Sequence, residues 1–259
     1  MLLRTLIGAA LAAIIAIAAR RTRSLTPDGA LAAVVTGTLA AAAGWAWAIL
    51  LIVYFVSSTA LSHLGRREKE QRTAKVVAKG GERDALQVFA NGAVFIAGAL
   101  LTIIEPNTRW LALGIGALAA SAADTWATEI GTLYGGGPRS IVTFRPVAAG
   151  MSGGVTAIGL IASAAGAGFI AILARVFGAH GDAIAIAAGG FVGALVDSLL
   201  GALIQTRRWC PACAQLTERI IHDCGTPTTA RGGVRWLTND AVNLLSGVAG
   251  GLLAAWMAR

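Results

Sequence analysis

The sequence predicts an all-α polytopic membrane protein with about eight transmembrane helices, and its composition, apolar segments and placement of basic residues support this. Of its 259 residues, 56% are hydrophobic and 13% are charged, and the mean hydropathy is +0.70. Such values are typical of integral membrane proteins. The 33 glycines, together with many alanines, favour helices that approach one another closely through small side chains.

Eight apolar segments account for the predicted helices. A transmembrane helix needs ~20 residues, and some segments are shorter, so the alternative for the second and third is one kinked unit. We expect the first segment to be a retained helix rather than a signal peptide, because three arginines follow it and only Arg4 precedes it. The segments are 2–19, 28–43, 45–62, 86–104, 109–130, 150–174, 183–204 and 238–257.

The basic residues gather in alternate connections between these segments. Connections 20–26, 63–85, 131–149 and 205–237 hold 17 of the 21 Lys and Arg residues. This asymmetry predicts that the four connections are cytoplasmic, and it explains the net charge of +8 without a nucleic acid partner. We therefore expect one integral membrane domain over residues 1–259 in the plasma (inner) membrane of a prokaryote, with its active-site loops facing the cytoplasm.

Acidic residues inside the fifth segment are the first sign of a functional site. Asp124 and Glu129 lie in an apolar span, and Arg139 and Arg145 follow between two glycine clusters. Carboxylates at membrane depth usually face a protein interior or a water-filled cavity, and with arginine and glycine-rich backbone they suit a metal-phosphate site. The two carboxylates lie ~140° apart on a regular helix, so both reach one metal only through water or where the helix breaks. The alternative is a capped helix end.

Two further aspartates fall in later segments. Asp197 lies well inside the seventh segment, with Gly193 and Gly201 four residues to either side, so that another backbone or a ligand can approach it closely. Asp240 opens the eighth segment, where the alternative is an ordinary N-cap. We expect both to serve a metal or phosphate site. Neighbouring polar residues extend the same track: Ser198, Gln205, Asn239 and Asn243.

The connection 63–85 carries a second cluster of polar residues. Lys79 and Arg83 lie beside glycines at the start of a helix, where an anion site forms readily. The alternative is contact with anionic lipid headgroups, which we favour for four earlier basic residues. Gln87 and Asn91 share a helical face and either join helices or line the site. The four earlier residues are Arg66, Arg67, Lys69 and Arg72.

All three cysteines lie in the connection 205–237. Cys210 and Cys213 form a CxxC pair, and His222 and Cys224 follow closely. Three cysteines and one histidine at this spacing are typical of a structural Zn²⁺ site. The alternative is a loop whose thiols stay reduced, since disulfides are disfavoured in the cytoplasm.

Six ordered motifs give the chain a resemblance to the transmembrane protein 19 and phytyl-phosphate kinase family of integral membrane proteins. One residue departs from the expected pattern, since Met151 stands where that family leads us to expect Thr. The motifs are Leu25-Thr26 through Gly29, Gly81-x-Arg83-Asp84-x-x-Gln87-Val88-x-Ala90-Asn91-Gly92, Ala123-Asp124-Thr125-x-Ala127-x-Glu129-Ile130-Gly131, Gly150-x-x-Gly153-Gly154-Val155, Val196-Asp197-Ser198-x-x-Gly201-Ala202-x-x-Gln205 and Asn239-Asp240-x-Val242-Asn243.

This resemblance implies an enzyme, a prenyl-phosphate kinase. The reaction would be Mg²⁺-dependent transfer of a phosphoryl group from a nucleoside triphosphate, with CTP as a candidate, to a phytyl- or geranylgeranyl-type prenyl monophosphate. Asp124, Glu129, Asp197 and Asp240 would hold Mg²⁺. Residues expected to bind the two phosphate-bearing substrates are Lys79, Arg83, Gln87, Asn91, Thr125, Arg139, Arg145, Gly153, Gly154, Ser198, Gln205, Asn239 and Asn243.

Two other functions use similar residues. A transporter of an anionic lipid or metabolite predicts polar residues through the whole membrane depth, whereas here they gather on one side. A nucleotidyltransferase that makes CDP-lipids uses the same metal and nucleotide, and only its product distinguishes it from the kinase.

Overall fold

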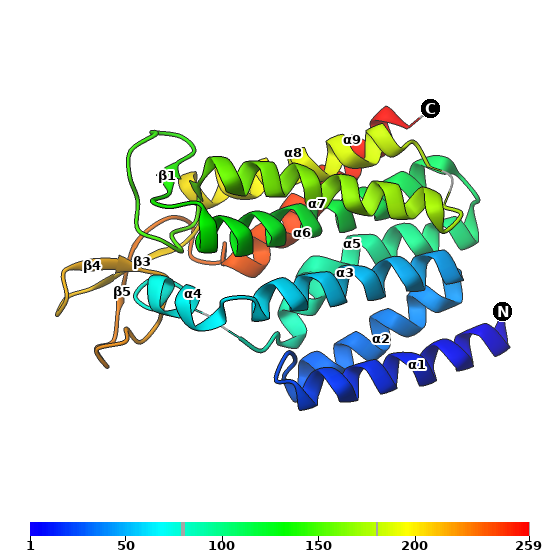
Figure 1. The fold of residues 1–259 in the computed structure, drawn as a ribbon, viewed down its shortest axis with the longest axis horizontal. Coiled ribbons are helices and arrows are strands. Elements are labelled where there is room, and N and C mark those ends of the chain that lie inside the picture. Colours follow the sequence, from blue (N-terminus) through cyan, green and yellow to red (C-terminus); the bar gives the residue numbers. More distant parts are fainter. Residues whose placement is uncertain (79–80, 180, 259) are drawn as a thin grey trace.

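The computed structural model describes residues 1–78, 81–179 and 181–258, and Lys79 lies outside the described residues. Within this part, eight long helices and one short helix, α4 (Arg66–Thr73), form an elongated bundle (Figure 1). The long helices are α1 (Leu2–Arg21), α2 (Pro27–Ala43), α3 (Trp45–His63), α5 (Ala85–Ile104), α6 (Thr108–Tyr134), α7 (Ala157–Val176), α8 (Ala183–Leu203) and α9 (Asn239–Met257).

The predicted fold class is confirmed, since each apolar segment corresponds to one long helix. Six of the helices are long and apolar enough to cross a membrane, and α2 is a shorter apolar helix. Extended backbone at Gly44 ends α2 and precedes α3, so these are two helices rather than one kinked unit. The start of α7 was predicted too early, because Thr156 caps the helix by accepting a hydrogen bond from Gly159 N at 2.9 Å.

Helix α6 lies at the centre of the bundle and packs against α3, α5, α7, α8 and α9. Its residues 114–123 are all buried, as expected for a helix that is apolar on every side. Small residues make this packing possible. A Cβ atom added at Gly193 of α8 would lie 2.6 Å from Ala120 Cβ of α6, and one at Gly189 would lie 2.4 Å from Gly250 O of α9.

The four basic connections meet at one end of the bundle, which is the end away from both termini in Figure 1. Leu25 and Arg83 form a parallel bridge, so the first two connections touch. Glu218 N donates to Val76 O at 2.9 Å, which joins the second connection to the fourth. Two small antiparallel sheets stiffen this layer: β1 (Arg139–Ser140) with β2 (Gly154–Val155), and β3 (Arg207–Cys210) between β4 (Gln215–Thr217) and β5 (Thr229–Gly232).

We expect Gly193→Val to destabilise the bundle, because its side chain would overlap Ala120. The free energy of unfolding should fall by about 1–3 kcal/mol, the usual cost of overpacking a core. Tryptophan fluorescence during thermal unfolding in detergent measures the change. Gly168→Val in α7 is the matched control, since a Cβ atom there meets nothing within 4 Å. Equal losses in both variants would contradict this account of the packing.

Candidate active site

A cavity of about 1220 Å³ opens between the helices at the end where the basic connections meet. Residues of α3, α5, α6, α8 and α9 line it together with residues of the connections. Most of the predicted site residues line this cavity: Asp124, Glu129, Asp197, Asp240, Arg83, Gln87, Asn91, Thr125, Gly153, Gly154, Ser198, Gln205, Asn239 and Asn243.

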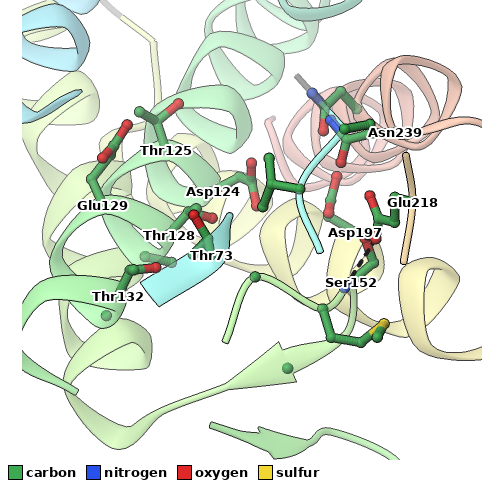
Figure 2. A pocket seen from close by; sticks show the side chains of 18 of the residues that line it. Thr73, Asp124, Thr125, Thr128, Glu129, Thr132, Ser152, Asp197, Glu218 and Asn239 are labelled. Carbon is green, nitrogen blue, oxygen red and sulfur yellow. Dashed lines mark hydrogen bonds between the residues drawn. The ribbon is translucent and has the colours of Figure 1, made fainter. Parts of the chain in front are cut away.

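Three aspartates from three helices reach this cavity. Asp124 comes from α6 and Asp197 from α8, and Figure 2 shows their carboxylates directed toward the same space. Asp240 lies in the first turn of α9 and is 5% exposed. It is not the N-cap, because Thr238 takes that position and its Oγ1 accepts from Ala241 N. Thr238 therefore caps the helix, and Asp240 lies in its first turn, where a negative charge is favoured.

One oxygen of Asp197 stands out within the cavity. In the part of the chain that the structure describes, its buried Oδ2 atom has no hydrogen-bond partner. Ser246 of α9 interacts with the same carboxylate, and Asp124 and Glu218 lie near enough to repel it. A buried carboxylate oxygen normally has a donor or a cation beside it. The arrangement is therefore suited to a cation bound between α6, α8 and α9.

A further acid at the cavity, Glu218, was not predicted from the sequence. It follows β4 and accepts hydrogen bonds from both the backbone N and the hydroxyl of Ser152, as Figure 2 shows. Gln205 Nε2 donates to the same hydroxyl at 2.8 Å. Burial raises the pKa of Glu218, while the Ser152 hydrogen bonds and the Arg207 charge act in the opposite direction. The family pattern leads us to expect a hydroxyl at position 151, where this chain has Met. Ser152 supplies a hydroxyl at the next position.

The glycine turn that carries Ser152 fits tightly against α8. Gly150 and Gly153 have positive φ angles of +83° and +79°, which favour glycine. A Cβ atom at Gly153 would lie 2.5 Å from Ala202 Cβ, and one at Gly201 would lie 3.0 Å from Gly153 N. Of the two glycines beside Asp197 in α8, Gly201 therefore admits the backbone of this turn, whereas Gly193 admits α6 and α9.

Glu129 lies apart from the aspartates. Because α6 is continuous from Thr108 to Tyr134, Glu129 points to the other side of the helix from Asp124, as Figure 2 shows. Its Oε1 accepts from Ser62 Oγ at 2.5 Å, and Lys69 forms an ion pair with Oε2. Glu129 lines the cavity, but its carboxylate is already paired within the protein.

The prediction that Lys69 contacts lipid headgroups is wrong. Lys69 is only 7% exposed, and its Nζ also donates to Leu61 O at 2.7 Å and Ser62 O at 3.1 Å. The physical reason is that α4 folds back against α6, where the partly buried carboxylate of Glu129 attracts a cation. Nothing in the sequence of the connection distinguishes Lys69 from its basic neighbours.

The remaining predicted cations divide into two groups. Arg83 lines the cavity, and its guanidinium donates to Thr59 Oγ1 at 3.0 Å and Ser62 Oγ at 3.3 Å. Arg139 and Arg145 are exposed and are not among the residues that line the cavity. Arg139 instead donates to Phe144 O at 3.0 Å within its own turn. Other arginines line the cavity: Arg66, Arg72, Arg208, Arg219 and Arg235.

Gln87 and Asn91 have local structural roles as well as lining the cavity. Gln87 Oε1 accepts from Asp84 N at 3.2 Å, and Asp84 accepts from Gln87 N, which forms a capping box at the start of α5. Asn91 Nδ2 donates to Gln87 O at 2.9 Å. These bonds fix the first turns of α5 beside Arg83.

The fold and the cavity together define a polytopic integral membrane protein with a polar, acid-rich cavity at one end of its helix bundle. The chain belongs to the family described as Integral membrane protein DUF92, whose model matches residues 10–251. The resemblance to the transmembrane protein 19 and phytyl-phosphate kinase family is thereby confirmed at the level of the family.

Relatives occur in plants and in prokaryotes. The chain is 29% identical to Protein PGR of Arabidopsis thaliana, over 94% of this chain and 92% of that protein. It is 31% identical to an uncharacterized membrane protein of Synechocystis, over 78% of each chain. It is 26% identical to Protein VTE6, chloroplastic, of Arabidopsis thaliana, over 90% of this chain and 65% of that protein. No solved structure matches the chain.

We expect Lys69→Met to destabilise the protein, because it leaves Glu129, whose side chain is 21% exposed, without its cation. The loss in the free energy of unfolding should lie below about 3–5 kcal/mol, which is the cost of breaking a fully buried ion pair. In detergent, thermal unfolding should occur at a clearly lower temperature than in the wild type. The double variant Lys69→Met/Glu129→Leu should recover most of the loss, since it removes both charges. A double variant no more stable than Lys69→Met would contradict this role for the pair.

Proposed function

We propose that this protein is a Mg²⁺-dependent prenyl-phosphate kinase, which transfers the terminal phosphoryl group of a nucleoside triphosphate to a prenyl monophosphate. The observation that carries the proposal is the convergence of Asp124, Asp197 and Asp240 from three helices in one arginine-lined cavity. Phosphoryl transfer depends chiefly on positioning and on neutralising charge. A cavity with carboxylates for a metal and arginines for phosphate provides both.

Asp124, Asp197 and Asp240 are the proposed Mg²⁺ ligands. Carboxylate oxygens are the donors that Mg²⁺ prefers, and the buried Asp197 Oδ2 has no hydrogen-bond partner within the described residues. When bound, the metal would neutralise the charge that the phosphate groups bring together. Glu129 has a different task in this proposal, because it fixes Lys69 and Ser62 beside the arginine that binds phosphate.

Arg83 is the proposed anchor of the acceptor phosphate. It is held by Thr59 and Ser62 in the wall of the cavity, and a planar guanidinium binds two phosphate oxygens at once. An oxygen of the prenyl monophosphate would attack the terminal phosphorus of the nucleotide. The bond from that phosphorus to the bridging oxygen would break, leaving a prenyl diphosphate and a nucleoside diphosphate. The attacking oxygen is already anionic and needs no general base.

The presence of a second, apolar cavity supports the proposal that the substrate is amphiphilic. It has a volume of about 200 Å³ and lies between α1, α2, α3 and α5. Four residues line both cavities: Tyr54, Arg83, Gln87 and Asn91. A phosphate at Arg83 therefore has an apolar space directly behind it, and a prenyl chain suits that space. A soluble phosphate metabolite would make no use of it.

The proposed setting is the plasma membrane of a prokaryote, with the cavity open to the cytoplasm. Positive-inside asymmetry supports this orientation, because the basic connections meet around the cavity. Nucleotides are present on that side, as the reaction requires. The polar residues gather at this end, which favours an enzyme over a transporter.

We expect Asp197→Asn to lower the rate of prenyl diphosphate formation roughly 100-fold or more, because a metal supplies several kcal/mol of charge stabilisation. Mass spectrometry of products from a panel of nucleotides and prenyl monophosphates measures this. Asp182→Asn is the matched control, since Asp182 caps the opposite end of the same helix. A nucleotidyl-lipid product would indicate a CDP-lipid synthase, and flux without nucleotide would indicate a transporter. Equal activity of Asp197→Asn and wild type would refute the kinase.

We expect Gly92→Leu to weaken binding of long-chain acceptors selectively. Gly92 lines the apolar cavity, and a Cβ atom there meets nothing within 4 Å, so leucine would fill space rather than displace backbone. The KM for geranylgeranyl phosphate should rise about tenfold, while the KM for a five-carbon prenyl phosphate should change little. Gly168→Leu in α7 is the control. An equal rise for both acceptors would argue against a tail site between these helices.

A further inference from the structure

The connection 205–237 holds a cluster of metal-ligating side chains outside the cavity. Cys210, Cys213, His222 and Cys224 each offer one ligand atom, and all four atoms lie within 4.8 Å of one another. Cys210 ends β3, and Cys213 lies in the turn that leads to β4, so one pair comes from a β-hairpin. His222 and Cys224 come from the segment that precedes β5.

The distances between these ligand atoms suit a tetrahedral metal site. Cys210 Sγ and Cys224 Sγ lie 3.6 Å apart, and His222 Nδ1 lies 3.2 Å from Cys224 Sγ. Zn–S bonds of ~2.3 Å in a tetrahedron place two sulfurs about 3.8 Å apart. A disulfide would need about 2.05 Å. The second ring nitrogen of His222 is buried without a hydrogen-bond partner in residues 1–78, 81–179 and 181–258.

Between residues 211 and 236 the same connection buries few large apolar side chains. Leu216, Ile220 and Ile221 are 39%, 71% and 60% exposed. A short segment that cannot bury a core usually depends on a metal or on disulfides, and all three cysteines are free. We propose that Cys210, Cys213, His222 and Cys224 bind a structural Zn²⁺ that holds this connection in its fold.

The proposed zinc site also orders one wall of the cavity. Between its two ligand pairs, Thr217 Oγ1 donates to Val76 O at 3.3 Å, and Arg219 Nη1 donates to Ala74 O at 2.7 Å. Glu218 lies between these two contacts and meets Ser152 at the cavity. The zinc therefore acts as a positioning element for Glu218. With four protein ligands it has no open coordination position and no catalytic role.

We expect purified protein to contain about one zinc per chain, the number that one four-ligand site holds. Elemental analysis by mass spectrometry measures it. Cys210→Ser should lose the zinc, and Gln215→Ala, an exposed change between the ligand pairs, should keep it. Three results would overturn the assignment. They are wild-type protein without zinc after growth in zinc-supplemented medium, iron bound in place of zinc, and zinc retained by Cys210→Ser. This measurement is independent of the proposed kinase activity.

A second measurement covers the case in which Cys210→Ser fails to fold. Titrating wild-type protein with a mercurial reagent should release zinc, which a chromogenic chelator detects. Hydrogen exchange should then accelerate in residues 207–232 and in their contact segments 73–77 and 150–153, while α6 and α8 stay protected. No release of zinc, or unchanged exchange in those segments after release, would contradict the positioning role.

Discussion

Acidic side chains that are largely shielded from water constrain this structure, because a carboxylate removed from water needs a cation or hydrogen-bond donors beside it. Glu129 has Lys69 and Ser62, and Glu218 has Ser152. Within the described part of the chain, Asp197 keeps a buried oxygen without such a donor. This contrast separates acids that hold the protein together from one that is available to a ligand.

Most of the fold was predictable, since apolar composition and segment length are local properties of the chain. Each of the eight long helices corresponds to one expected segment, although α7 begins later than predicted, and local caps such as Thr26 and Thr156 set helix starts. The short helix α4 was not predicted. It is polar, and its contact with α6 and the ion pair of Lys69 hold it together with two i,i+4 ion pairs of its own, Arg66–Glu70 and Glu68–Arg72.

The candidate site was predictable only in part. Asp124 and Asp197 stand out because carboxylates are rare inside apolar spans, and the structure places both at one cavity. Glu218 could not be predicted from the sequence, because it is one acid in a long polar connection. Only its tertiary contact with Ser152 brings it to the site. Arg139 suggested a phosphate ligand by its place between glycines, yet it is not among the residues that line the cavity and instead donates to Phe144 O within its own turn.

The proposed function requires that Asp124, Asp197 and Asp240 bind a divalent cation together with the phosphates of a nucleotide. Electron paramagnetic resonance of Mn²⁺, which replaces Mg²⁺, tests this directly when the protein is supplied with a non-hydrolysable nucleoside triphosphate. We expect bound Mn²⁺ with hyperfine coupling to ³¹P in the wild type, and loss of this signal in Asp197→Asn. An identical signal in the wild type and in Asp197→Asn, or no bound Mn²⁺ in the wild type, would contradict it.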